Sequence, residues 1–248
     1  MTTSASLPNL PRIPIDWRWP IALVLSTALV VVVITYFYFP DLPDPMPVHW
    51  NAAGEADGFQ AKTLPNFLFT LLIAPVILLV VLLGSQALIS HLSTTITGVG
   101  SGVKDTNQAH RVWLGQKHMM SAMGWYLTGL NLVILIGFAA TYGPGSGSGR
   151  FLVLILIGAG VLTAFLIWSS VRAQREAERR YPPPEEERGK RWGIFHNDPE
   201  DSRIFVPTEG GGGSNFTPNI GTTGGRIAAA VLFGLPVILL LWVTWQAF

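Results

Sequence analysis

Side chains that could bind a ligand are concentrated in one short stretch, PMPVHWNAAGEADG at residues 45–58. The candidate contact residues there are His49, Trp50, Asn51, Glu55 and Asp57. An imidazole grouped with carboxylates can bind a divalent metal ion, but the spacing matches no strong metal motif. Alternatively, the polar groups contact a peptide or protein, or they satisfy one another within a tight turn. We take these five residues as the candidate ligand- or partner-binding site, with no metal and no other cofactor.

The same stretch is rich in residues that restrict the backbone. Prolines at positions 40, 43, 45 and 47 favour an extended, polyproline-like path. Asn51 can hydrogen-bond within its own turn, and Gly54 and Gly58 can take positive φ. We therefore expect the loop at residues 40–62 to hold one defined structure.

Long apolar runs on both sides of this loop indicate a membrane protein. Only 12% of the 248 residues are charged and 49% are hydrophobic, whereas soluble domains carry about 25% charged residues. A membrane helix needs about 20 mostly apolar residues. Runs of this length, none of which contains Asp, Glu, Lys, Arg or His, occur at residues 20–39, 63–88, 119–141, 151–171 and 227–248.

The first run is too long for a cleavable signal peptide, and no small-residue cleavage site follows it, so we expect a retained anchor. Lys and Arg residues set the orientation of the five spans. From the N-terminal tail through the four loops their numbers are two, one, three, one and nine. This alternation predicts five transmembrane helices with the N-terminus inside and the C-terminus outside.

The absence of cysteine excludes disulfides and thiolate metal sites. The net charge of +1 argues against nucleic acid as a partner, because such proteins usually carry a clustered basic excess. The predicted partners are therefore the lipid bilayer, another membrane or extracytoplasmic protein or peptide, and a cytoplasmic protein.

The sequence predicts an all-α membrane protein with a small cytoplasmic β-hairpin module between the fourth and fifth helices. RAQREAERR continues the fourth helix until YPPP ends it. RWGIFH and RIFVPTE then flank the turn NDPEDS and read as the two strands of a hairpin, GGGGS is a flexible break, and NFTPNIG can add a third strand.

The expected organisation is as follows: a disordered or interfacial tail at 1–19, two helices with the structured outer loop at 20–90, a cytoplasmic loop at 91–118, two helices at 119–171, the helix extension and module at 172–226, and the fifth helix at 227–248. Within the cytoplasmic loop, KDTNQAHRVWLGQKH is either an interfacial helix or an extension of the third span.

The motif LPDPMPVHWNAAGEADGF resembles the signature of a bacterial membrane-protein family of unknown function, a proline-rich lead followed by Pro-x-His-Trp-Asn and Gly-x-x-Asp-Gly. That family includes the immunity proteins against a sporulation-delaying toxin (SdpI-like proteins). The resemblance covers about a quarter of the chain. It implies a bacterial plasma-membrane protein with a sensor, immunity or accessory role, and it implies no reaction.

A second resemblance covers RWGIFHNDPEDSRIFVPTEGGGGSNFTPNIG. This stretch resembles a small uncharacterised cytoplasmic module often found behind such membrane segments. Its candidate contact residues are Trp192, Asn197, Asp201 and Arg203. Asp198 is either inserted before the proline of the pattern or replaces it, and the tail FTPNIG departs from the usual form.

Four classes of function are compatible with this architecture. A sensor or immunity-like protein would recognise a peptide or protein with its outer loop, and an accessory subunit would assemble into a larger membrane complex. A transporter or an intramembrane enzyme fits less well, because proton relays, ion sites and intramembrane acid catalysis usually need an ionisable side chain within a span. We expect the protein not to be an enzyme.

Overall fold

The computed structural model describes residues 7–51, 55–98, 103–143, 150–185, 190–192, 195–207 and 216–234. Contacts divide the chain into two compact units. The hairpin unit comprises residues 16–84, 123–165 and 237–248, and the module unit comprises residues 1–15, 85–122 and 166–236. Three long helices each contribute residues to both units.

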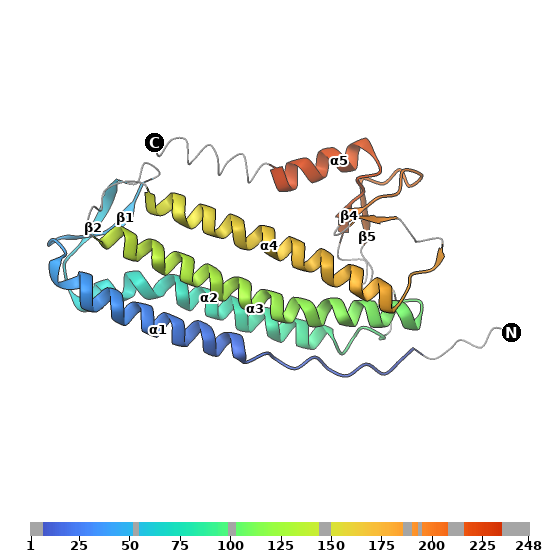
Figure 1. Ribbon diagram of the computed structural model, residues 1–248, viewed down its shortest axis with the longest axis horizontal. Helices are drawn as coiled ribbons and strands as arrows, with labels where there is room; N and C mark the ends of the chain where they lie inside the picture. The colour runs from blue at the N-terminus through green and yellow to red at the C-terminus, as the bar shows by residue number, and fades with distance from the viewer. Residues whose placement is uncertain are drawn as a thin grey trace. The chain divides into compact units, whose positions relative to one another are not determined.

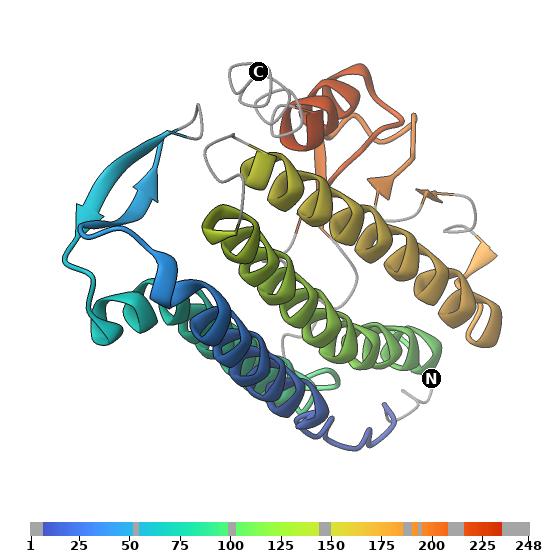
Figure 2. The ribbon, with the colours of Figure 1, turned by 60° about the vertical axis from the view of Figure 1, so that its left-hand side comes forward.

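Four of the five predicted spans are helices long and apolar enough to cross a membrane. They are α1 (Arg18–Tyr38), α2 (Leu64–Leu92), α3 (Thr106–Tyr142) and α4 (Arg150–Arg180). In the hairpin unit, segments of these helices lie side by side (Figures 1 and 2). Large apolar side chains are exposed on each of them, as expected for helices whose surroundings are lipid. The chain is a multi-pass membrane protein.

The fifth predicted span is only partly described. Helix α5 (Thr223–Ala229) is followed by a single π-helical turn at Ala230–Gly234. Residues 235–248 lie outside the described residues, so the fifth span and the orientation of the C-terminus stay predictions.

Two helices continue beyond their predicted spans. Residues 106–118 extend the third helix, which confirms one of the two interpretations of that segment. The Asp105 side chain accepts a hydrogen bond from the Gln108 N–H at 2.8 Å, which caps the start of α3. Helix α4 ends at Arg180, immediately before the Tyr-Pro-Pro-Pro stop, as predicted.

The hairpin unit has an apolar core between its helices. Val31, Ile34, Phe67, Leu71 and Leu135 are buried there, from α1, α2 and α3. Between α1 and α3, the Asn131 amide Nδ2 donates to Thr27 Oγ1 at 2.9 Å, and the Asn131 side chain is fully buried. This interhelical hydrogen bond joins α1 and α3 within the core of the unit.

Small residues permit close helix packing at defined points. A Cβ placed on Gly158 of α4 would lie 2.8 Å from Val133 Cγ1, and one on Gly124 of α3 would lie 2.1 Å from the Trp19 ring. Gly160 has no atom within 4 Å of such a Cβ among the described residues. Of these two glycines of α4, Gly158 therefore permits the close contact with α3.

Residues 7–15 of the N-terminal tail make defined contacts within the module unit, although the sequence predicts a disordered or interfacial segment. The Ile13 N–H donates to Ser93 Oγ at 2.9 Å, and Arg12 Nε donates to Ser90 Oγ at 2.9 Å. Trp113 Nε1 donates to the Pro11 carbonyl at 2.8 Å. These bonds hold the segment against the end of α2 and the start of α3.

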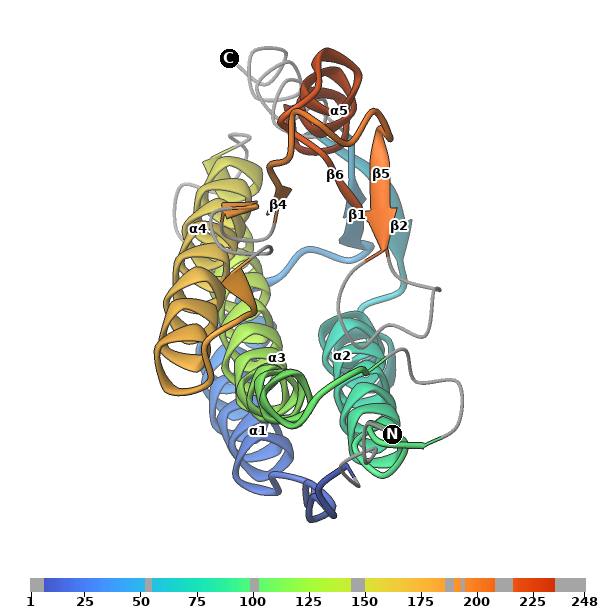
Figure 3. The ribbon, with the colours of Figure 1, turned by 90° about the vertical axis from the view of Figure 1, so that its right-hand side faces the viewer.

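In the part of the chain that the structure describes, six short strands form three two-stranded antiparallel sheets: β1 (Met46–Trp50) with β2 (Ala56–Gln60), β3 (Arg191–Trp192) with β4 (Phe195–His196), and β5 (Phe205–Pro207) with β6 (Phe216–Pro218). The last two sheets belong to the module unit, where β4, β5, β6 and α5 lie together (Figure 3). The predicted strand at 216–218 is present.

The predicted pairing within the module is wrong. RWGIFH does not pair with RIFVPTE across NDPEDS. The first segment pairs with itself, as β3 with β4, and β5 pairs with β6 across the glycine-rich segment. A parallel bridge from His196 to Asn219 then links the two sheets.

Candidate functional site

The outer-loop candidates lie on the β1–β2 hairpin, which follows α1. Alternation along β1 separates two faces. Met46 is fully buried, and Val48 and Trp50 pack against the core of the hairpin unit. His49 points the other way, with 71% of its side chain exposed. The apolar face thus anchors the strand while the polar face is open to solvent.

Four further contacts fix the hairpin: two join it to Tyr142 at the end of α3, and two tie its ends together through Lys62. The Tyr142 hydroxyl donates to the Pro47 carbonyl at 3.2 Å, and the Tyr142 and Trp50 ring centroids are 5.8 Å apart. At the base of the hairpin, Lys62 Nζ donates to the carbonyls of Pro40 and Leu42, each at 2.7 Å. Trp50 is therefore an anchor in this structure.

The four remaining candidates form two pairs. His49 Nδ1 lies 2.5 Å from Asp57 Oδ1 across the strands. At the turn, the Glu55 N–H donates to Asn51 Oδ1 at 3.0 Å, and Asn51 Nδ2 donates to Glu55 Oε2 at 3.3 Å. Asn51 thus hydrogen-bonds within its own turn, as the sequence predicts.

Gly58 has a different role from the predicted one. It does not adopt positive φ, and a Cβ there would lie 2.7 Å from His49 Cβ. Glycine at this position allows the two strands to approach opposite His49, its register partner. Gly54 lies outside the described residues.

The hairpin therefore presents an imidazole, an amide and two carboxylates on one small, anchored element. Both pairs are accessible to solvent: 45% of the Asp57 side chain is exposed, Glu55 is exposed, and Asn51 is half-buried. Within the described residues, no group of three or more His, Cys, Asp or Glu side chains is placed to hold a metal ion. The arrangement can donate and accept hydrogen bonds to a polar partner.

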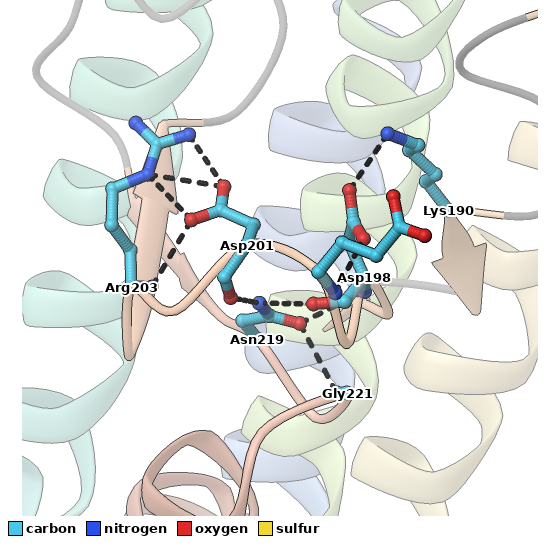
Figure 4. Close-up of polar contacts among 7 residues, drawn as sticks. Lys190, Asp198, Asp201, Arg203, Asn219 and Gly221 are labelled. Carbon is cyan, nitrogen blue, oxygen red and sulfur yellow. Dashed lines mark hydrogen bonds and ion pairs between the residues drawn. The ribbon is translucent and has the colours of Figure 1, made fainter.

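The second set of candidates lies in the module unit. Arg203 forms a bidentate ion pair with Asp201, with Nη2 2.5 Å from Oδ2 and Nε 2.9 Å from Oδ1 (Figure 4). The Arg203 side chain and backbone N–H together lower the pKa of Asp201 from 3.8 to about 2. Asn197 is exposed, and its backbone N–H donates to the Lys190 carbonyl at 2.7 Å. Trp192 lies on β3, paired with Phe195.

Asn219, which the sequence does not single out, organises this module. Its side chain is fully buried, and Figure 4 shows it next to Asp198 and Asp201. Oδ1 accepts from the N–H groups of Asp198 and Gly221 at 3.0 and 3.1 Å, and Nδ2 donates to the carbonyls of Asp198 and Asp201, each at 2.8 Å. One amide therefore fixes three backbone positions that lie up to 21 residues away.

Asp198 is also structural. Its carboxylate accepts from Lys190 Nζ at 2.8 Å and from the Glu200 N–H at 3.0 Å, and these donors lower its pKa. Its own N–H is the group that Asn219 accepts from, and proline would lack this donor. The Asp198 N–H and carboxylate therefore both contribute to the packing of the module.

Comparison with known proteins identifies one region. Residues 27–79 match a family described as a domain of unknown function, DUF1648. The DUF1648 region runs from the middle of α1 through the β1–β2 hairpin to the middle of α2, so it contains all five outer-loop candidates. No curated protein matches the chain, and no solved structure does.

Proposed function

We propose that the protein is a bacterial plasma-membrane sensor of the immunity type, related to the SdpI-like proteins. Its β1–β2 hairpin recognises a peptide or protein outside the cytoplasm, and its module contacts a cytoplasmic partner. The observation that carries this proposal is the two-faced hairpin, with Met46 buried in the core, His49, Glu55 and Asp57 exposed to solvent, and Asn51 half-buried beside Glu55. An anchored element that presents polar groups loses little conformational entropy on binding.

The proposal is for recognition without catalysis. The polar groups of the hairpin are accessible to solvent and paired with one another, whereas catalytic acids and bases commonly lie in desolvated clefts. Displayed donors and acceptors at the rim of a small contact suit a protein or peptide partner. The hairpin lies within the DUF1648 region, which supports a functional role for this region in addition to any role of the module.

A rescue experiment tests the proposal. A strain lacking the gene should become sensitive to a secreted peptide toxin, and the wild-type gene should restore resistance. We predict that His49→Ala, Asn51→Ala and Asp57→Ala each fail to restore resistance, because each removes one member of a displayed pair. Gln60→Ala, an exposed change on β2, serves as the matched control and should rescue fully.

Quantitative blotting of membrane fractions separates function from folding in this experiment. Loss of resistance with normal membrane levels supports recognition by the hairpin. If the three variants rescue as well as the wild type, the recognition role is wrong. If they disappear from the membrane while Gln60→Ala persists, the polar pairs are structural.

An accessory subunit of a larger membrane complex is the second candidate. Helix α4 favours this candidate. Among the described residues, none in the most apolar part of α4 is fully buried. This part of the helix could therefore pack against a helix of another membrane protein. Purification from native membranes in mild detergent, followed by mass spectrometry, would reveal a partner in fixed stoichiometry. Recovery of the chain alone would count against this candidate.

A further inference from the structure

The module carries an exposed apolar surface on its β5–β6 sheet. Phe205 and Phe216 are 43% and 57% exposed, and Ile204, directly before β5, is 47% exposed, whereas Val206, on the face of β5 opposite Phe205, is only 7% exposed. Phe205 pairs with Pro218 and Pro207 pairs with Phe216, so the two aromatic side chains are diagonal neighbours on one face. Small soluble elements seldom expose two aromatic rings together without a partner.

Helix α5 continues this surface. A Cβ placed on Gly224 would lie 2.9 Å from Ile204 Cγ1, so Ile204 packs on the first turn of the helix. Ile227, one turn further along, is 61% exposed, and Val231 and Leu232 beyond it are 54% and 53% exposed. The interface patch, as we name it, consists of Ile204, Phe205, Phe216, Ile227, Val231 and Leu232.

The sequence indicates what this patch meets. Arg226 is the last charged residue of the chain, and residues 227–248 are apolar, a length that suits one crossing of the hydrocarbon core. The start of α5 then lies at the bilayer surface, with the arginine at headgroup level. Because Ile204 contacts this first turn and directly precedes β5, we place the β5–β6 sheet near the same level. Aromatic and aliphatic side chains at that depth are stabilised by shallow insertion.

We propose that the interface patch inserts into the headgroup region of the lipid leaflet from which α5 enters the bilayer. The module is then held at the membrane surface, and Asn197, Asp201 and Arg203, which are not part of the patch, are left for a protein partner. The proposal rests on the fifth span of the proposed architecture. It goes further by assigning a lipid ligand to the apolar patch of the module.

The chain contains no cysteine, so single-cysteine variants can report the depth of each position without background. Nitroxide labels would be placed on Phe205→Cys and Phe216→Cys, with Ser202→Cys, an exposed residue in the acidic turn, as the control. The full-length protein would be reconstituted in vesicles of phosphatidylcholine and phosphatidylglycerol. Oxygen, which concentrates in lipid, and a nickel chelate, which stays in water, would then be compared as relaxation agents.

The proposal predicts an oxygen-to-nickel accessibility ratio severalfold higher at positions 205 and 216 than at position 202. Ratios equal to that of position 202 would mean that the patch faces water, and exclusion of both agents would mean that protein covers it. Either result overturns the proposal. A label on Leu240→Cys separates failure of the patch proposal from failure of the fifth span. If the label at position 240 is accessible to oxygen while the label at position 216 is accessible to nickel, only the patch proposal is rejected. If the label at position 240 is accessible to nickel, the fifth span is rejected.

Discussion

The side-chain amide of Asn219 connects parts of the module that have little else to hold them. Its four hydrogen bonds run to backbone groups of Asp198, Asp201 and Gly221, and the amide is fully buried. A module of this size cannot bury a large apolar core, so the satisfaction of backbone groups by one amide has an unusually large effect on its stability.

We therefore predict that Asn219→Ala destabilises the module by about 2–4 kcal/mol, since it leaves buried backbone donors and acceptors without partners. Hydrogen exchange measured by mass spectrometry should increase severalfold in residues 195–207 and 216–222. Asn197→Ala is the matched control, because Asn197 is exposed and should change exchange little. Equal exchange in the two variants would contradict the role given to Asn219.

The Asp201–Arg203 pair predicts an acid-sensitive module. The pKa of Asp201 is depressed to about 2, so the pair contributes stability above the ordinary carboxyl pKa. That contribution is lost as the pH falls below about 4 and through about 2. The module of Asp201→Asn should thus be less stable than that of the wild type at neutral pH and equally stable near pH 2. The fraction of folded module would be measured from the NMR signal of a fluorine label on Thr223→Cys.

Glu200→Gln supplies the control for removing one negative charge from the same turn. If Asp201→Asn and Glu200→Gln show the same pH profile, the effect is one of general charge and not of the paired carboxylate.

The sequence was informative at this scale only where partners are close along the chain. The Asn51 turn could be predicted, because its acceptor and donor are four residues apart. The roles of Lys62 and Asn219 could not, because their partners are about 20 residues away and a single lysine or asparagine in a loop carries no distinguishing pattern. Trp50 was taken as a contact residue, and only the structure reveals its packing on Tyr142.

At the scale of elements, apolar runs predicted the helices well because lipid requires continuous helical hydrogen bonding over a known length. Strand pairing was less predictable. The hairpin at 46–60 was expected only as a defined loop, and β5 pairs across the glycine-rich segment that looked like a break. Register in such short strands depends on tertiary contacts, here those of Met46 and Asn219.

The packing of α1 on α3 gives a prediction at this scale. Gly124→Ala should lower the free energy of unfolding by about 1–3 kcal/mol, since the new methyl group would overlap the Trp19 ring. The measurement is the apparent melting temperature in detergent. Gly160→Ala, which has open space around it among the described residues, should be neutral or stabilising. The same loss of stability in both variants would mean that the close contact with Trp19 does not restrict the size of the side chain at position 124.

At the scale of the whole molecule, we propose that the β1–β2 hairpin recognises its partner outside the cytoplasm and that the module contacts its partner in the cytoplasm. The four helices support a multi-pass protein, and the bias of Lys and Arg residues supplies the direction. The proposed function depends on this direction, because the same hairpin in the cytoplasm could not meet a secreted peptide. The location of the β1–β2 hairpin is therefore the central claim.

Labelling of single cysteines in intact cells tests that claim most directly. Gln60→Cys lies on the exposed edge of the hairpin and Ser202→Cys lies in the module, and the native chain has no cysteine to interfere. A membrane-impermeant maleimide should label position 60 in intact cells and position 202 only after lysis. Labelling of position 202 in intact cells, with position 60 protected until lysis, would contradict the account.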